Sequence, residues 1–396
     1  MQSLPPNREN AHRPNPAIRF TAQKSLLKHF ALPALQSPVA VWFLPMPVSP
    51  PSSIPSGLPC PPEAIDDFLS QPPTAVAASL ATATGPFLVL GAGGKMGLHL
   101  TVMLRRALDQ LGRNDRVIAV SRFRTLRDAA DFTRLGVEVL PCDLANAAEL
   151  AALPEAGTIF FLAGVKFGTA NSSALLHATN VVLPATVAAR FPRSRIVALS
   201  SGNIYPFVDP KSGGATESTV PGPVGDYAAS CLAREQTFAR ASAEHANPIA
   251  LIRLNYSVEF RYGLLGDIGQ RVFAGQPVDV TTGYVNVIWQ NDAVAHCIRA
   301  VEVAASPAVP LNITGAETLS VRELAHRFGA ALDRPVTITG TEAPTALLNN
   351  AARSHRLFGP PATSVDQMIA WVAAWLRLGG ETWGKPTGFE RRDGKF

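Results

Sequence analysis

Three glycines in the segment FLVLGAGGKMG (87–97) have the spacing of a phosphate-binding turn. Gly91 permits a tight turn after the apolar run, Gly94 lets the backbone approach a pyrophosphate, and Gly97 lets the next helix pack closely. Amide groups and the dipole at the start of that helix then attract the anion. The segment predicts a dinucleotide site to which Lys95 and Met96 also belong; the alternative is a Gly-rich turn without a ligand.

The residues after the second predicted strand indicate which dinucleotide binds. NAD-preferring sites hold the ribose hydroxyls with an acidic residue at this position. The sequence has VSRF there, with Ser121 and Arg122 and no acid. An Arg binds a 2′-phosphate through two parallel charge-assisted hydrogen bonds, and Lys95 offers a second cation. We therefore expect NADP, with NAD as the alternative if Arg122 is only a solvated surface charge.

Alternating strands and helices must position this turn. Short apolar runs predict strands at 87–90, 116–120, 137–144, 158–164, 195–201 and 248–255. Helical spacing lies between them, as at 98–111 and 172–191. Such a series indicates an α/β fold with a Rossmann-like, doubly wound parallel sheet. After residue 256 the pattern weakens into a smaller C-terminal substrate lobe, with a strand at 285–289 and helices near 292–305, 320–332 and 364–377.

Composition divides the chain into three parts. Residues 1–62 hold 14 of the 34 prolines and no sustained periodicity, which predicts a disordered extension or a start site placed too early. Residues 63–255 are the predicted NAD(P)-binding Rossmann domain, in which 63–71 forms a short docking helix. Residues 256–385 are the predicted substrate lobe.

Charge, apolar runs and cysteine spacing exclude several classes of function. Five basic residues against one acid in the first 60 residues give +4 of the net +5, so no basic patch in the folded part indicates a nucleic-acid partner. No apolar run is long enough to span a membrane. The four cysteines and eight histidines lack metal-ligand spacing, so we expect no metal site. Reduced thiols in the cytoplasm are the default expectation.

Several segments together resemble the extended short-chain dehydrogenase/reductase superfamily, in particular its NAD-dependent epimerase/dehydratase family. The resemblance rests on the order and spacing of the glycine turn, CDL (142–144), LAG (162–164), SSGNIYP (200–206), ATESTVPGPVGDYAAS (215–230) and LNITGAETLSVRELA (311–325). It covers roughly residues 85–380 and implies a catalytic Ser201 and Tyr227. It also implies that Asp143 and Leu144 contact the adenine and that Ala163 and Gly164 lie beside the nicotinamide half.

Position 231 departs from the family, which has a Lys four residues after the catalytic Tyr. Cys231 cannot lower the pKa of Tyr227 by its charge. One interpretation is that Lys166 or Arg234 substitutes for the missing cation. A second is that the protein binds the nucleotide without redox activity, and a third is that Cys231 itself reacts. Tyr205 is an alternative tyrosine, but it falls where the family has a structural one.

By resemblance, the substrate lies between the Rossmann domain and the lobe. Asn255, Tyr256 and Arg261 follow the sixth strand and are the substrate-side candidates, although Arg261 also suits a structural ion pair. The resemblance implies an NAD(P)-dependent epimerase/dehydratase or reductase that acts on a nucleotide-sugar-like or polyhydroxylated carbonyl substrate. The alternative is a non-catalytic NAD(P)-binding regulatory or sensor protein. Family members often dimerise through helices of the Rossmann domain, so a homodimer is compatible with the resemblance.

Overall fold

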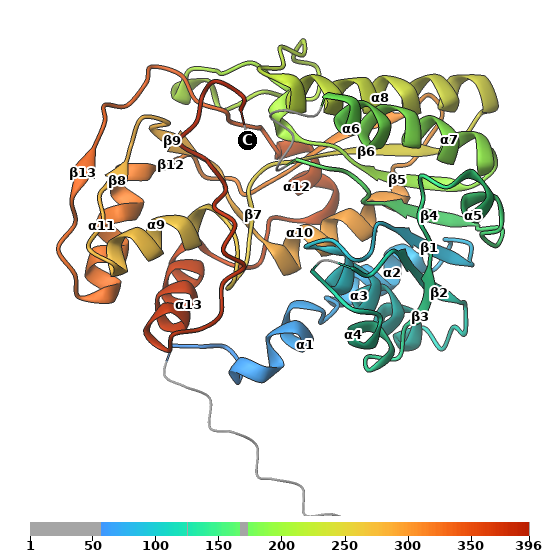
Figure 1. Ribbon diagram of the computed structural model, residues 1–396, viewed down its shortest axis with the longest axis horizontal. Coiled ribbons are helices and arrows are strands. Elements are labelled where there is room, and N and C mark those ends of the chain that lie inside the picture. Colours follow the sequence, from blue (N-terminus) through green and yellow to red (C-terminus); the bar gives the residue numbers. More distant parts are fainter. Residues whose placement is uncertain (1–56, 125, 167–172, 396) are drawn as a thin grey trace, which may run out of the picture. The chain divides into compact units, whose positions relative to one another are not determined.

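Seven parallel strands form the central sheet, in the order β3-β2-β1-β4-β5-β6-β11 (Figure 1). Their bounds are β1 Phe87–Leu90, β2 Val117–Ser121, β3 Glu138–Pro141, β4 Thr158–Phe161, β5 Arg195–Leu199, β6 Ile249–Leu254 and β11 Val309–Ile313. The computed structural model describes residues 57–124, 126–166 and 173–395. The strand order reverses between β1 and β4, which is where open α/β sheets bind their ligands.

Helices cover both faces of this sheet. In β1, Phe87 and Val89 pack into one apolar cluster with α2, α3 and α10, while Leu88 and Leu90 pack into another with α7 and α8. The covering helices are α2 Thr74–Leu80, α3 Gly97–Gln110, α4 Ala129–Thr133, α5 Ala147–Ala151, α6 Ser173–His177, α7 Leu183–Arg190, α8 Asp226–His245, α10 Gln290–Arg299 and α12 Ala352–Phe358. Because neighbouring side chains in a strand point to opposite faces, a strand buried on both sides reads as continuously apolar.

The predicted Rossmann-like α/β fold is confirmed, with some differences in detail. All six predicted strands form, and β1 has the predicted bounds. The predicted helix at 172–191 is divided by a π-helical turn, Ala178–Val182, between α6 and α7. β11 was not predicted as a sheet strand, yet it lies beyond residue 256 and pairs with β6. The predicted domain boundary at 255 stays a prediction, although the chain after it returns to the sheet.

The C-terminal lobe packs around an aromatic core. Phe260 meets Trp289 edge-on with ring centroids 5.0 Å apart and lies 5.7 Å from Trp375. The lobe comprises β7 Ser257–Val258, α9 Leu264–Phe273, β8 Val278–Asp279, β9 Tyr284–Val285, β10 Ile288–Trp289, β12 Leu319–Ser320, α11 Val321–Leu332, β13 Ile338–Thr339 and α13 Val365–Arg377. Strands of two residues gain little from their own hydrogen bonds, so burial of these apolar side chains stabilises the lobe.

The chain before the sheet joins the lobe core. Residues 1–56 of the predicted extension lie outside the described residues, whereas Leu58 and Cys60 are buried against the lobe. The predicted docking segment 63–71 contains α1 (Ile65–Leu69), which buries Ile65 and Leu69 in the same core. Within the described ranges, no helix is long and apolar enough to cross a membrane, and no cluster of metal-ligating side chains occurs.

Candidate active site

The glycine turn joins β1 to α3 with the geometry that its spacing predicts. Gly91 has φ +86°, and a Cβ there would lie 2.6 Å from the backbone nitrogen of Ala163. A Cβ on Gly97 would lie 2.0 Å from the carbonyl oxygen of Ala92, so only glycine allows this approach of α3 to the turn. No side chain caps the N-terminus of α3. This helix end therefore has backbone amides that can face an anion.

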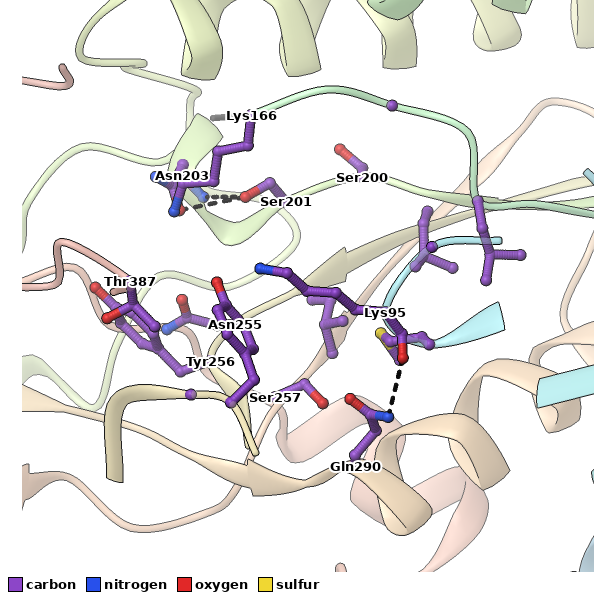
Figure 2. A pocket seen from close by; sticks show the side chains of 18 of the residues that line it. Lys95, Lys166, Ser200, Ser201, Asn203, Asn255, Tyr256, Ser257, Gln290 and Thr387 are labelled. Atoms are coloured by element: carbon purple, nitrogen blue, oxygen red, sulfur yellow. Dashed lines mark hydrogen bonds between the residues drawn. The ribbon is translucent and has the colours of Figure 1, made fainter. Parts of the chain in front are cut away.

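A cavity of about 370 Å³ opens at the carboxyl ends of β1, β4, β5 and β6 (Figure 2). It brings together residues predicted separately from the sequence: Gly91, Gly94, Lys95, Met96, Gly97, Gly164, Lys166, Ser201, Tyr227, Asn255 and Tyr256. The predicted cofactor turn, catalytic pair and part of the substrate side thus share one space. Its volume is near the low end of the range of about 300–1,000 Å³ common for ligand pockets.

Ser201 and Tyr227 meet at the cavity wall. Tyr227 lies in the first turn of α8 and hydrogen-bonds with Ser201 and with Cys231. Ser201 also bonds with Asn203, whose backbone nitrogen donates to its Oγ at 3.2 Å. Burial, followed by the nearby Cys231, raises the pKa of the Tyr227 hydroxyl far above its ordinary value, so it stays protonated. The pair therefore presents a protonated hydroxyl at the cavity wall.

Cys231 lies one helical turn after Tyr227 and is fully buried. It packs with Ile204, Tyr205 and Ala215, and it does not line the cavity. Burial raises the pKa of its thiol, which disfavours the thiolate that a nucleophile requires. These contacts favour a packing role for Cys231 over the interpretation that it reacts.

Lys166, one of the two candidate cations, lies in the cavity wall near Tyr227. It follows β4, and its Nζ lies 5.5 Å from the centroid of the Tyr227 ring. Burial lowers the pKa of Lys166 to about 8, while the nearby Cys231 and Asp267 oppose that shift. Arg234, the other candidate, donates to the carbonyl of Leu199 at 2.9 Å. It also donates to Asn180 at 2.6 Å. Arg234 lines the cavity as well, and its charge lowers the pKa of Tyr227 against the larger, opposite effects of burial and Cys231.

Lys95 lines the cavity together with the glycine turn. The sequence analysis offered it as a second cation for a 2′-phosphate, whereas its Nζ lies 3.2 Å from the centroid of the Tyr262 ring, in the lobe. Figure 2 shows the side chain running from the glycine turn toward Tyr256. Burial lowers its pKa to about 7, and the charges of Lys166 and Lys385 add to this shift.

The predicted adenosine side lies outside the cavity. Ser121, Arg122, Asp143, Leu144 and Ala163 are not among its lining residues. Arg122 is exposed and its nearest acid is Asp143, at 3.8 Å. The position beside the expected ribose thus has a basic side chain, Arg122, next to an acidic one, Asp143. The presence of Arg122 alone therefore does not indicate that the site binds a 2′-phosphate.

Two of the three substrate-side candidates reach the cavity. Asn255 and Tyr256 line it, and Tyr256 has φ +35°, which is unusual for a side chain of its size. Arg261 does not line it, because its guanidinium is buried in an ion pair with Asp66 at 2.7 Å and with Glu259 at 3.2 Å. The structural alternative for Arg261 is therefore the one that these contacts support. Tyr205 is also structural, since it bonds with Asn312 at 2.9 Å.

The sequence analysis missed a chain of contacts that holds the glycine turn. Asp66 in α1 accepts hydrogen bonds from His99 and Arg127, both at 2.8 Å. His99 contacts Gln290 at 2.6 Å, and Gln290 donates to the carbonyl of Lys95 at 3.4 Å. Asp66, His99 and Gln290 come from α1, α3 and α10, while Arg127 and Lys95 lie in connecting segments, and nothing in their local sequence signals that they meet.

The cavity also has polar atoms that fit a bound ligand. The hydroxyl oxygens of Ser200 and Ser257 are buried and have no hydrogen-bond partner among the described residues. Both residues line the cavity, so a ligand with oxygen atoms would satisfy them. With the glycine turn and the uncapped start of α3, the residues present fit a dinucleotide cofactor.

A family model matches the Rossmann part of the chain. Residues 87–258 match the NAD dependent epimerase/dehydratase family. No curated protein shows detectable similarity to the chain. The match includes the glycine turn, Ser201, Tyr227 and β6, and it ends at β7.

Solved structures share the fold at low sequence identity. A dTDP-glucose 4,6-dehydratase from Streptomyces venezuelae with NAD has a TM-score of 0.64 and 18% identity, over 74% of this chain and 97% of that one. A UDP-glucose 4-epimerase from Thermus thermophilus with NAD has a TM-score of 0.61 and 16% identity, over 74% and 98%. A UDP-glucuronic acid 4-epimerase from Bacillus cereus with NAD and UDP-glucuronic acid has a TM-score of 0.61 and 15% identity, over 74% and 99%.

Proposed function

We propose that the protein is an enzyme of the NAD-dependent epimerase/dehydratase class, because the model of that family matches residues 87–258. Its proposed substrate is a nucleotide-sugar-like or other polyhydroxylated carbonyl compound, as in the structural neighbours. The observation that carries the proposal is the meeting of Ser201, Tyr227 and Lys166 in the cavity that also opens onto the glycine turn.

We propose NAD as the cofactor. The neighbouring structures contain NAD, and they give no support to the NADP preference expected from Arg122. The glycine turn and the N-terminus of α3 are the elements suited to hold its diphosphate. Hydride exchange with a substrate carbon is the chemistry that this cofactor supplies when bound.

The protein's own residues manage the proton. The Tyr227 hydroxyl, which its raised pKa keeps protonated, donates its proton to a substrate carbonyl oxygen. Ser201, which bonds with Tyr227, orients that oxygen. The cation of Lys166 beside the ring supports the phenolate left behind, which is the part that the family Lys plays by resemblance. Asn255 and Tyr256 orient the substrate from the lobe side.

Calorimetric titration with NAD, NADH, NADP and NADPH tests the cofactor, and Tyr227→Phe tests the chemistry. We expect micromolar binding of NAD(H), retained in the variant, with turnover lowered by about 10²–10⁴-fold. Binding without any turnover on a panel of sugar and nucleotide-sugar substrates would instead favour the regulatory alternative. If none of the four dinucleotides binds, the proposed function is wrong.

A further inference from the structure

The segment after α13 runs from the lobe to the Rossmann part of the chain, and we call its residues 383–395 the strap. Figure 1 shows it as the dark red chain that leaves α13 and passes across the lobe. Trp383 stacks on Tyr262 with ring centroids 5.7 Å apart. Thr387 donates from its backbone nitrogen and its hydroxyl to Asp267, at 2.7 and 2.5 Å. These contacts hold the first half of the strap on α9 and on the loop before it.

The end of the strap contacts the start of α8. A Cβ on Gly225 would lie 2.5 Å from the carbonyl oxygen of Gly394, so the two backbones are in close contact. The guanidinium carbon of Arg392 lies 4.1 Å from the centroid of the Phe207 ring, in the loop that follows β5. Gly225 directly precedes α8, the helix that carries Tyr227. The strap therefore connects the lobe to the element that holds the proton-donating hydroxyl.

The strap also forms part of the walls of two adjoining cavities. Thr387 lines the large cavity, and Figure 2 shows it on the same side as Asn255 and Tyr256. Three strap residues line a second, smaller cavity: Phe389, Arg391 and Gly394. Asn203 and Tyr256 line both cavities. The second cavity therefore begins where the substrate half of the first, the part lined by Asn255 and Tyr256, ends.

The second cavity has room for little more than solvent. Its volume is about 30 Å³, against about 370 Å³ for the large cavity. One water molecule needs roughly 10–15 Å³ of such space, so the second cavity holds about two. Phe389 fixes this wall, because its side chain is buried in the lobe core and its carbonyl oxygen accepts from Thr282 at 2.7 Å. A nucleoside does not fit there while the strap is in place.

A nucleotide sugar would need this space. The glycine turn and the start of α3 belong to the large cavity and suit the diphosphate of the cofactor. The substrate half is then left for the substrate. A sugar ring held there beside Tyr227 would have to place an attached nucleoside diphosphate beyond Tyr256, where the strap lies. A compound without a nucleotide fits the large cavity and leaves the strap undisturbed.

We infer that the strap limits the length of the substrate, so that the cavity accepts a compound of about the size of a monosaccharide and excludes the nucleoside diphosphate of a nucleotide sugar. The inference rests on the proposed function, because it selects the class without a nucleotide among the proposed polyhydroxylated substrates. It makes the strap, and Phe389 within it, a specificity-determining element of the site.

Calorimetry on the NAD-saturated protein tests the inference with a long probe, UDP-glucose, and two short probes, D-gluconate and D-glucitol. A variant chain that ends at residue 381 lacks the strap. We expect it to bind UDP-glucose at least about tenfold more tightly than the full chain, which equals about 1.4 kcal/mol. Its affinity for the short probes should change by less than about threefold, because their part of the cavity stays as it is.

Two glycine variants test the same point in a chain that keeps Phe389. Gly394 has φ +72°, and a Cβ there would lie 2.3 Å from the carbonyl oxygen of Val224. Gly394→Ala should therefore push the end of the strap away from α8 and raise the affinity for UDP-glucose by about threefold or more. Gly384 has φ +58°, but among the described residues a Cβ there would meet nothing within 4 Å. Gly384→Ala, which has similar backbone strain without the clash, is the matched control and should bind UDP-glucose as the wild type does.

Three outcomes overturn the inference. In the first, the full chain binds UDP-glucose with micromolar affinity, so the strap leaves room for the nucleotide. In the second, the shortened chain, folded by its thermal midpoint, gains no affinity for UDP-glucose; if that chain does not fold, an unchanged affinity in Gly394→Ala decides instead. In the third, UDP-glucose and the short probes gain equally, so the cavity has loosened as a whole. If the wild-type protein does not bind NAD, the proposed function fails separately, and the same titrations without NAD still compare the variants.

Discussion

Two regions in which the molecule buries positive charge differ in how that charge is compensated. In the first region, the Asp66 carboxylate accepts hydrogen bonds from Arg127 and Arg261 at 2.7–2.9 Å. Burial alone would raise the pKa of Asp66, but these hydrogen bonds outweigh it and hold that pKa far below its usual range. At the cavity, Lys95 and Lys166 extend into space that a ligand can enter. The ion pairs of Asp66 connect separate elements of the fold, whereas the lysines that line the cavity are positioned to contact a ligand.

The largest effect should come from the first region. Asp66→Asn leaves Arg127 and Arg261 buried without the carboxylate that compensates them. We expect the free energy of unfolding to fall by about 3–5 kcal/mol, measured by urea denaturation. Glu155→Gln, whose ion pair with Arg190 is largely exposed, is the control and should change stability little. An Asp66 variant as stable as the control would contradict the distinction between the two regions.

The second region should respond in activity rather than in stability. Lys166→Met removes the cation beside Tyr227. We expect the pKa of Tyr227 to rise by about one to two units and kcat to fall by about 10–100-fold as a result. The free energy of unfolding should stay unchanged or rise, because folding lowers the pKa of Lys166 and so disfavours its charge.

The double variant Lys166→Met, Cys231→Lys sharpens this result. If Lys166 replaces the family Lys, a Lys at position 231 should restore part of the lost kcat. Failure to restore it in a folded double variant would show that Lys166 has another role, and the thermal midpoint shows whether the larger side chain is accepted at this buried position.

The pH dependence of anion binding should separate the cavity from the Asp66 cluster. The pKa of Lys95 is about 7 and that of Lys166 about 8, since burial lowers both. Both lysines lose their charge as the pH rises through these values. For Lys95, Lys166 and Lys385 act in the same direction as burial, while Asp267 and Glu259 oppose it; for Lys166, Cys231 and Asp267 oppose it. The affinity for the anionic D-gluconate should therefore fall between pH 6 and pH 9, while that for the neutral D-glucitol stays constant. Equal pH profiles for the two probes would argue against lysine recognition.

The smallest effect is expected outside both regions. Arg122 is exposed and has only a distant acid partner, so Arg122→Gln should change NAD affinity by less than about threefold. If Arg122 instead binds a 2′-phosphate, the variant should lose about 1.5–3 kcal/mol of NADP affinity. Calorimetry with both dinucleotides distinguishes these results.

The elements that follow local patterns were predictable, and long-range partnerships were not. The apolar strands and the glycines at 91, 94 and 97 follow rules of local sequence, so the sheet and the turn were predicted. β11 was missed because its pairing with β6 depends on residues far apart in the chain. The direction of Lys95 depends on Tyr262, which lies more than 160 residues later, and the partners of Asp66 are equally remote. Spacing identified the cavity, but it did not assign each charge within it.

The placement of the tryptophans has an optical consequence. Four of the five, Trp289, Trp371, Trp375 and Trp383, follow residue 256, and the fifth, Trp42, lies outside the described residues. Strands β1 to β6 contain none. In the part of the chain that the structure describes, selective excitation of tryptophan therefore reports on the lobe, while circular dichroism reports on sheet and helices throughout; a Trp42→Phe background removes the fifth emitter. Trp383 stacks on Tyr262, and the ammonium group of Lys95 lies over the same Tyr262 ring. The fluorescence of Trp383 should therefore change when a ligand binds in the substrate half of the cavity.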